Sequence, residues 1–254
     1  MSAPILVFDS GVGGLSIVAE IRSQLPKLDI HYLFDDARLP YGRLAETELV
    51  DGCVELICKA VDNTRAGMVV VACNTASTLV LPSLRERLAI PVVGVVPAIK
   101  PAAALTQNHS IAVLATLGTI KRDYTQQLIE DFANGCKVHL FAASEMVAMA
   151  EAKLAGEPVN MVELEMILSN VRNSGADTLV LGCTHFPVLR DEIASVLGEE
   201  TRIVDSGRAI ANRVAALLVD TDAENFGFNK RFEFSHTRAE LPPALNTYLK
   251  SYAS

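Results

Sequence analysis

The chain has 254 residues, of which half are apolar and a fifth are charged, a balance typical of globular proteins and not of disordered chains. Its 22 basic and 30 acidic side chains give a net charge of −8, which argues against binding to the phosphate backbone of a nucleic acid. The five cysteines form no CxxC pair and no regular framework, so we expect reduced thiols in a cytoplasmic protein.

Two apolar stretches raise the question of a membrane segment. The N-terminal MSAPILVFDS has no basic residue before its apolar run and soon reaches Asp9, so we interpret it as a first strand and not as a secretory signal. The longest charge-free run, between Arg65 and Arg85, has the polar centre CNTAST and contains Pro82. A buried strand followed by a turn and a helix explains this run better than a membrane span does.

Short runs rich in Val, Ile and Leu alternate with longer helical patterns. This alternation predicts an α/β fold. Because several runs are apolar throughout, we expect mainly parallel strands covered on both faces. The predicted strands are Ile5–Phe8, Ile30–Phe34, Met68–Ala72, Val92–Val95, Ile111–Leu114, Val138–Phe141, Thr178–Leu181 and Arg202–Val204.

The stretch Thr47–Val61 illustrates the helical pattern. Its apolar residues recur at a spacing of three to four and form one stripe, made of Leu49, Val50, Cys53, Val54, Ile57, Ala60 and Val61. A buried cysteine commonly behaves as a small apolar residue, so we interpret Cys53 and Cys58 on this helix as core residues. The same interpretation holds for Cys136, which lies on the apolar face of a predicted strand.

Two halves of the chain resemble each other. The segment MVVVACNTASTLVLPSLRE aligns with TLVLGCTHFPVLRDEIAS, which places Cys73 and Cys183 110 positions apart. The first strand, ILVFDSGVGGLS, aligns with IAVLATLGTIKRDYT, with Ile5 and Ile111 106 positions apart. The similar offsets indicate a duplicated unit. We therefore expect two similar α/β lobes related by a pseudo-twofold axis, with a site in the cleft at the carboxyl ends of their strands.

Cys73 and Cys183 each follow a predicted strand, so both are expected to face that cleft. A thiol at a helix N-terminus ionises readily and can act as a base. A thiolate on one side of a small ligand and a thiol on the other suit a reaction in which a proton leaves one face of a carbon atom and another arrives at the opposite face. Such a transfer needs no redox cofactor.

The residues after each cysteine support a ligand site. Asn74, Thr75, Thr184 and His185 open predicted helices or turns, so their backbone N–H groups can bind carboxylates, and Thr75 can also cap its helix. His185 is a candidate electrostatic partner for the neighbouring cysteine. Cys183 and His185 are too few ligands for a metal, and the remaining histidines show no ligand spacing, so we predict no metal.

A glycine-rich segment follows the first strand. Its sequence, DSGVGG, fits neither of the common phosphate-binding patterns. We interpret the glycines as a tight turn that lets Asp9 and Ser10 project into the cleft, where a carboxylate suits the ammonium group of an amino acid. The turn Pro40-Tyr41-Gly42 follows the second strand, and Tyr41 can close over a ligand.

These motifs resemble those of the glutamate racemases, cofactor-independent enzymes that make D-glutamate for bacterial peptidoglycan. The resemblance runs from residue 5 to about residue 219 and rests on VFDSGVGGLS, DDARLPYG, ACNTAS, VVGVVPAIKPA, LATLGTIKRDYT, LGCTHFPVL and VDSG. It implies Cys73 as the acid/base residue for the D-enantiomer and Cys183 as that for the L-enantiomer. It also implies further functional residues, namely Asp9, Ser10, Pro40, Tyr41, Gly42, Asn74, Thr75, Thr184 and His185.

The resemblance further implies a glutamate that assists the second cysteine through its neighbouring His185. It would be Glu151, although the local sequence MVAMAE departs from the family's usual FVPLVE. The resemblance also divides the chain into a first lobe of residues 1–96 and 205–254 and a second lobe of residues 97–204. Its implied ligands are L-glutamate and D-glutamate, with no cofactor, no nucleic acid and no membrane.

Alternative functions stay open at this point. An aspartate racemase would share the paired cysteines, but those relatives usually carry Glu where this chain has His185. A decarboxylase or a hydantoin racemase of the same superfamily is more distant, and the decarboxylases keep one cysteine. A non-catalytic binding protein for acidic amino acids would gain nothing from two oxidisable thiols. The sequence leaves the oligomeric state open, a homodimer being the commonest oligomer.

Overall fold

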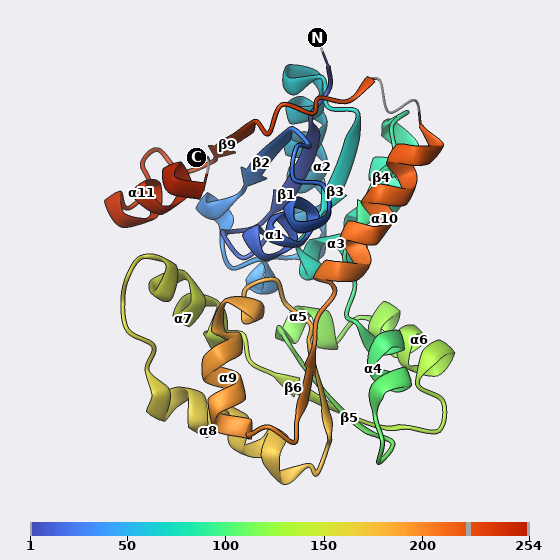
Figure 1. Cartoon of the computed structure of the whole chain (residues 1–254), viewed down its shortest axis with the longest axis vertical. Helices are drawn as coiled ribbons and strands as arrows, with labels where there is room; N and C mark the ends of the chain where they lie inside the picture. Colours follow the sequence, from blue (N-terminus) through green and yellow to red (C-terminus); the bar gives the residue numbers. More distant parts are fainter. Residues whose placement is uncertain (1, 222–224, 253–254) are drawn as a thin grey trace.

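The computed structural model describes residues 2–221 and 225–252, which form two α/β lobes stacked on each other (Figure 1). Each lobe contains one sheet in which every strand pair is parallel. The first sheet has the order β4-β3-β1-β2-β9, with β1 (Ile5–Asp9), β2 (Ile30–Phe34), β3 (Met68–Val71), β4 (Val92–Gly94) and β9 (Phe232–His236). The second has the order β6-β5-β7-β8, with β5 (Ser110–Ala115), β6 (Lys137–Ala142), β7 (Thr178–Leu181) and β8 (Arg202–Val204).

Helices cover both faces of each sheet. Around the first sheet lie α1 (Leu15–Gln24), α2 (Glu46–Thr64), α3 (Asn74–Arg87), α10 (Gly207–Asp220) and α11 (Pro243–Tyr252). Around the second lie α4 (Ile99–Leu105), α5 (Leu117–Ile120), α6 (Asp123–Phe132), α7 (Glu145–Leu154), α8 (Met161–Asn173) and α9 (Arg190–Leu197). Each sheet accordingly has an apolar cluster on either face. The fully buried strands explain the continuous apolar runs of the sequence.

The predicted α/β fold and the eight predicted strands are confirmed, with ends that differ by at most one residue. The helical stripe is confirmed as well, because α2 buries Leu49, Cys53, Val54 and Ile57. Cys53 is fully buried, whereas Cys58 and Cys136 lie partly buried at the margins of the apolar clusters. No described helix is long and apolar enough to span a membrane.

Strand order and register show the internal duplication. In the first sheet Ile5 pairs with Ile30 on one side and with Met68 on the other. In the second sheet Ile111 pairs with Val138 and Thr178 in the same way. The strand order β4-β3-β1-β2 in the first lobe therefore corresponds, strand by strand, to the order β8-β7-β5-β6 in the second lobe. This correspondence confirms the two similar lobes that the aligned segments predicted.

The chain passes between the lobes twice. It leaves the first lobe after β4 and returns after β8, where Ser206 Oγ donates a hydrogen bond of 2.5 Å to the carbonyl oxygen of Val96. After the return, α10 packs against α1, and β9 pairs with β2 (Figure 1). This arrangement supports the proposed division into residues 1–96 with 205–254 and residues 97–204, which stays a prediction. Strand β9 was missing from the predicted strands.

Candidate active site

A small cavity lies where the carboxyl ends of the two sheets meet. It measures about 20 Å³, room for about one water molecule. Its walls come from both lobes and include Cys73 and Cys183. The lining residues are Ser10, Leu39, Pro40, Tyr41, Gly42, Cys73, Asn74, Thr75, Thr116, Val147, Cys183, Thr184 and His185. Ten of these lining residues were predicted as site residues. The cavity is too small for a molecule of amino-acid size, so its walls must move apart to admit one.

Cys73 lies between the end of β3 and the first turn of α3. It is the residue that precedes this helix, and its side chain is almost fully buried. The thiol Sγ donates to Ser10 Oγ at 3.5 Å. Burial, and secondly the nearby Asp9 carboxyl, raise the pKa of Cys73 well above its ordinary value. Cys73 is therefore a protonated thiol in this arrangement and is suited to donate a proton.

Cys183 has a different environment. Its Sγ lies 3.8 Å from His185 Nδ1, and His185 Nε2 lies 2.7 Å from Glu151 Oε1 on α7. Burial acts to lower the pKa of His185, but the contacts with Cys183 and Glu151 outweigh it and raise that pKa well above its ordinary value. A buried imidazolium beside Cys183 can stabilise a thiolate or return a proton to it.

Glu151 lies outside the cavity wall and contacts His185. Burial opposes its ionisation, yet the hydrogen bond from His185 lowers the pKa of Glu151 below its ordinary value. The same oxygen, Oε1, accepts a 3.0 Å hydrogen bond from the backbone N–H of Val12 in the first lobe. The second lobe's Glu151 is thus held by a contact across the lobe boundary.

Asp9 is fully buried and lies one layer behind the cavity. Its Oδ2 accepts hydrogen bonds from the N–H of Gly14 at 2.5 Å and from Thr184 Oγ1 at 3.1 Å. Burial is the main influence and raises the pKa of this carboxyl. The expected projection of Asp9 into the cleft is therefore not seen in this closed arrangement, where Thr184 stands between it and the cavity. Its contact with a ligand stays a prediction.

The glycines of the DSGVGG segment let the second lobe come close. A β-carbon on Gly11 would overlap Glu151 Oε1, and one on Gly13 would overlap the ring of His185. The sequence predicted a tight turn here. The structure adds a second reason for glycine, since the imidazole and the carboxylate pack directly against this backbone.

Sequence reasoning missed three wall residues, Leu39, Thr116 and Val147. Thr116 forms a hydroxyl cluster with Thr75 and Thr119, at 3.0 and 3.1 Å, and this cluster joins the lobes at one end of the cavity. The duplication was the signal that could have found Thr116. It follows β5 as Ser10 follows β1, and the offset of 106 between the two strands carries Ser10 onto it.

The arrangement suits acid/base chemistry in a nearly dry space. Two thiols of different lobes reach one cavity, one beside an imidazolium–carboxylate pair and the other beside a buried carboxyl. Among the described residues no three His, Cys, Asp or Glu side chains are grouped to hold a metal ion. Two thiols in such a site are suited to move protons at a carbon atom, as a general acid and a general base would.

Comparison with known proteins gives the particular family. The family described as Asp/Glu/Hydantoin racemase matches residues 13–214. The glutamate racemase of Shewanella pealeana is 57% identical over 251 residues, covering 98% of this chain and 94% of the relative. The structure of Escherichia coli glutamate racemase in complex with L-glutamate and the activator UDP-MurNAc-Ala is 45% identical, with a TM-score of 0.92, and covers 99% of this chain and 96% of that one.

A third similar structure is glutamate racemase from Francisella tularensis in complex with D-glutamate. It is 26% identical, with a TM-score of 0.77, and covers 99% of this chain and 94% of that one. The chain therefore belongs to the Asp/Glu/hydantoin racemase family and is an isomerase, an amino-acid racemase. The resemblance predicted from the sequence motifs is confirmed.

Proposed function

We propose that this enzyme interconverts L-glutamate and D-glutamate, with Cys73 and Cys183 as the two acid/base residues. The observation that carries the proposal is the placement of one thiol from each lobe in the wall of a single cavity. The relatives named glutamate racemase, and the similar structures with L-glutamate and D-glutamate bound, support glutamate as the substrate.

In the L-to-D direction Cys183 takes the α-proton and Cys73 delivers one to the opposite face. The imidazolium of His185 stabilises the Cys183 thiolate, whereas the raised pKa of Cys73 keeps its proton available. In the reverse direction the roles exchange. A substrate ammonium group near Asp9 would then favour ionisation of Cys73, because the added positive charge offsets the effect of the carboxyl.

The substrate's charges need partners that the cavity can supply. We assign the ammonium group to Asp9 and Ser10. We assign the carboxylates to the hydroxyls of Thr75 and Thr184, the side-chain amide of Asn74 and the backbone N–H groups of these residues. Among the residues that the structure describes, no Lys or Arg lines the cavity, so neutral donors and the N-terminus of α3 must hold the carboxylates. The walls Pro40, Tyr41 and Gly42 close over the ligand.

The cellular role follows from this reaction. We propose that the enzyme acts in the cytoplasm and needs no cofactor. We also propose that the D-glutamate it makes is used for peptidoglycan synthesis. The oligomeric state stays open, a homodimer being the commonest oligomer. An aspartate racemase is the alternative activity, and His185 at the position where aspartate racemases usually carry Glu argues for glutamate.

The test is racemisation of L-glutamate in deuterated water by protein dialysed against a chelator and treated with a carbonyl-trapping reagent. With two bases, D-glutamate formed early carries deuterium at the α-carbon, and the remaining L-glutamate stays almost unlabelled. D-glutamate as starting material gives the mirror result. Activity that vanishes on dialysis and returns with pyridoxal phosphate would contradict the cofactor-free mechanism.

Single-cysteine variants complete the test. Cys73→Ser and Cys183→Ser should each abolish racemisation in both directions, because an alcohol is a far weaker acid than a thiol. Each variant should still exchange the α-proton of the enantiomer that faces the surviving thiol. Early deuterium in the unconverted enantiomer of the unmodified enzyme, at the rate of conversion, would indicate one base and overturn the proposal. Glutamate binding without racemisation would favour a binding protein.

A further inference from the structure

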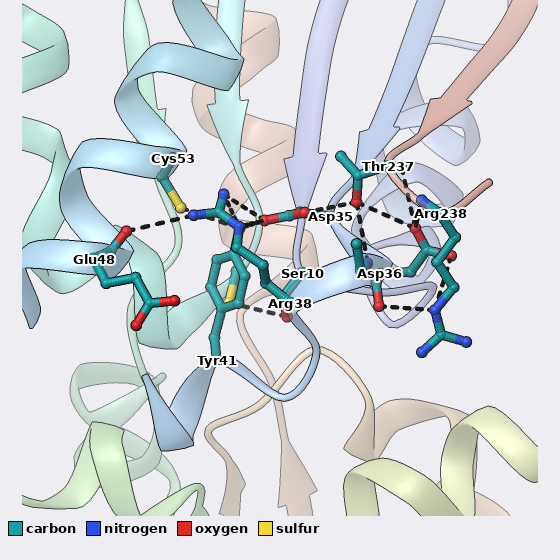
Figure 2. A network of polar contacts seen from close by, with 11 residues as sticks. Ser10, Asp35, Asp36, Arg38, Tyr41, Glu48, Cys53, Thr237 and Arg238 are labelled. Atoms are coloured by element: carbon teal, nitrogen blue, oxygen red, sulfur yellow. Dashed lines mark hydrogen bonds and ion pairs between the residues drawn. The ribbon is translucent and has the colours of Figure 1, made fainter. Parts of the chain in front are cut away.

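A buried polar network joins the segment after the last strand to the cavity wall (Figure 2). Thr237, directly after β9, donates from Oγ1 to Asp35 Oδ1 at 2.6 Å. The other oxygen of Asp35, Oδ2, accepts from the Tyr41 hydroxyl at 2.5 Å and from Arg38 at 2.5 Å. Figure 2 shows Asp35 between Thr237 on one side and Arg38 and Tyr41 on the other. Thr237 is therefore two hydrogen bonds away from a side chain that lines the cavity.

The Tyr41 hydroxyl is fully engaged in this network. It donates to Asp35 and accepts from Cys53 Sγ at 3.2 Å and from Arg38 Nη2 at 3.4 Å. A phenol has one proton and two lone pairs, so nothing remains for a hydrogen bond to a ligand. Tyr41 is 2% exposed and lines the cavity beside Cys73. Its contribution to the wall is the position of the ring, which the hydroxyl contacts fix.

Both oxygens of the Asp35 carboxylate also have hydrogen-bond partners. Asp35 is 1% exposed, and its Oδ1 pairs with Thr237 and its Oδ2 with Tyr41 and Arg38. The guanidinium of Arg38 lies against α2, where a β-carbon on Gly52 would overlap it. Because Asp35 cannot be solvated, losing the Thr237 hydroxyl would leave Oδ1 unpaired in a buried position, and the carboxylate would turn to find another donor.

The Thr237 hydroxyl is separable from the role of β9 in the sheet. The strand pairs with β2 through backbone contacts, in the register Ile30 with Phe232 to Phe34 with His236. Neither these contacts nor the hydrogen bond from the Thr237 backbone N–H to Asp36 Oδ1 at 3.2 Å uses the hydroxyl. Replacing Thr237 by valine therefore keeps the strand and the side-chain shape and removes the donor to Asp35. It also removes the acceptor of the Ala37 N–H at 3.1 Å and a 3.4 Å contact with Asp36 Oδ1, both of which Thr237→Ser retains.

We propose that Thr237 is a positioning residue for racemisation, which orients the Asp35 carboxylate and, through it, the Tyr41 ring that closes the substrate cavity. The proposal rests on the proposed function, in which that ring helps to hold glutamate between the two thiols. A wall displaced by a fraction of an ångström misaligns the α-carbon with both thiols, and such misalignment slows proton transfer in either direction.

The test compares kcat/KM for glutamate racemisation in Thr237→Val, Thr237→Ser and the unmodified enzyme. We expect Thr237→Val to lower kcat/KM about tenfold, because the displaced Tyr41 ring would misplace the substrate relative to the thiols. Thr237→Ser keeps the donor and should restore kcat/KM to within about twofold. The matched control is Thr247→Val on α11, where an exposed threonine loses only a hydrogen bond to the Pro243 carbonyl. Urea unfolding of each variant confirms that the assayed protein is folded.

A double-mutant cycle with Tyr41→Phe tests the connection. If Thr237 acts through Asp35 on Tyr41, Thr237→Val should cost little more in the Tyr41→Phe background, and the two effects are not additive. Additive effects, or a folded Thr237→Val enzyme with unchanged kcat/KM, would overturn the inference. A loss in Thr237→Val that serine does not rescue would also overturn it. An unmodified enzyme that does not racemise glutamate would instead refute the proposed function.

Discussion

The contact between Glu151 and His185 makes a pH-dependent prediction about the second thiol. Glu151→Gln replaces the carboxylate by a neutral amide of the same shape. The amide oxygen can still accept from His185 Nε2 and from the N–H of Val12, as Oε1 does now. The substitution therefore removes charge and keeps geometry, so any effect reports on the charge of His185 beside Cys183.

The size of the effect follows from the burial of the pair. His185 is 2% exposed and Glu151 21% exposed at a separation of 2.7 Å, so solvent screens the interaction only in part. A hydrogen bond to a charged group contributes about 1.5–3 kcal/mol, which corresponds to a factor of roughly 10 to 150 in the protonation equilibrium. Removing the negative charge lowers the pKa of His185. As the pH rises, the imidazolium that assists Cys183 then loses its proton at a lower pH than in the unmodified enzyme.

The assay is the pH profile of kcat/KM for both enantiomers. The basic limb should move to lower pH in Glu151→Gln, and Glu157→Gln, which removes an exposed carboxylate after α7, should leave it unchanged. The two enantiomers have equal free energy, so kcat/KM must agree between the two directions at every pH, which checks the data internally. A basic limb in the same place as that of the unmodified enzyme would refute a role for Glu151 through His185.

Three further predictions concern other sites. Thr184→Val removes a donor to Asp9 and should raise the KM for glutamate. Thr75→Val should act similarly at the end of the cavity where Thr75 contacts Thr116. Unchanged kcat and KM in both variants would show that these hydroxyls do not bind the substrate. Asp177, whose pKa its hydrogen bonds lower to about 2, adds stability above its unfolded pKa and loses it as pH falls toward 2. Urea unfolding of Asp177→Asn should therefore show a loss on the order of 1 kcal/mol at pH 7 that disappears at low pH. Burial raises the pKa of Cys53 to about 12, so mass spectrometry should find Cys53 unalkylated by iodoacetamide at pH 8 in the native protein.

Much of the fold was predictable because its local patterns agree with its tertiary structure. Strands buried on both faces have continuous apolar sequences, and the aligned segments around Cys73 and Cys183 gave the equivalence of the lobes. The missed strand β9, with the sequence FEFSH, lies at the edge of the sheet. There one face is partly exposed and polar residues alternate with apolar ones, which is the pattern of a half-buried strand. The predicted strands were runs rich in Val, Ile and Leu, which this segment lacks.

The sequence predicted which residues form the site, but it did not predict most of the contacts between them. Motifs placed Cys73, Cys183 and their neighbours at strand ends, where topology gathers side chains. Contacts such as Val12 with Glu151, or Thr184 with Asp9, join residues more than a hundred positions apart across the lobe boundary. They depend on how closely two separately folded lobes approach, and a local pattern carries no information about that distance.

The hydrogen bond between Ser206 and Val96 joins the two segments that connect the lobes, and it bears on how the lobes move during turnover. The two connecting segments lie together, so we expect the lobes to separate by torsion about this line while each sheet stays intact. Opening would break the contacts of Thr184 with Asp9 and of Val12 with Glu151, and closing would remake them. We expect each turnover to include this opening and closing, since the contacts between the lobes that place charges beside the thiols exist only while the lobes are closed. Solvent viscosity should accordingly slow the enzyme even where the chemical step is fast.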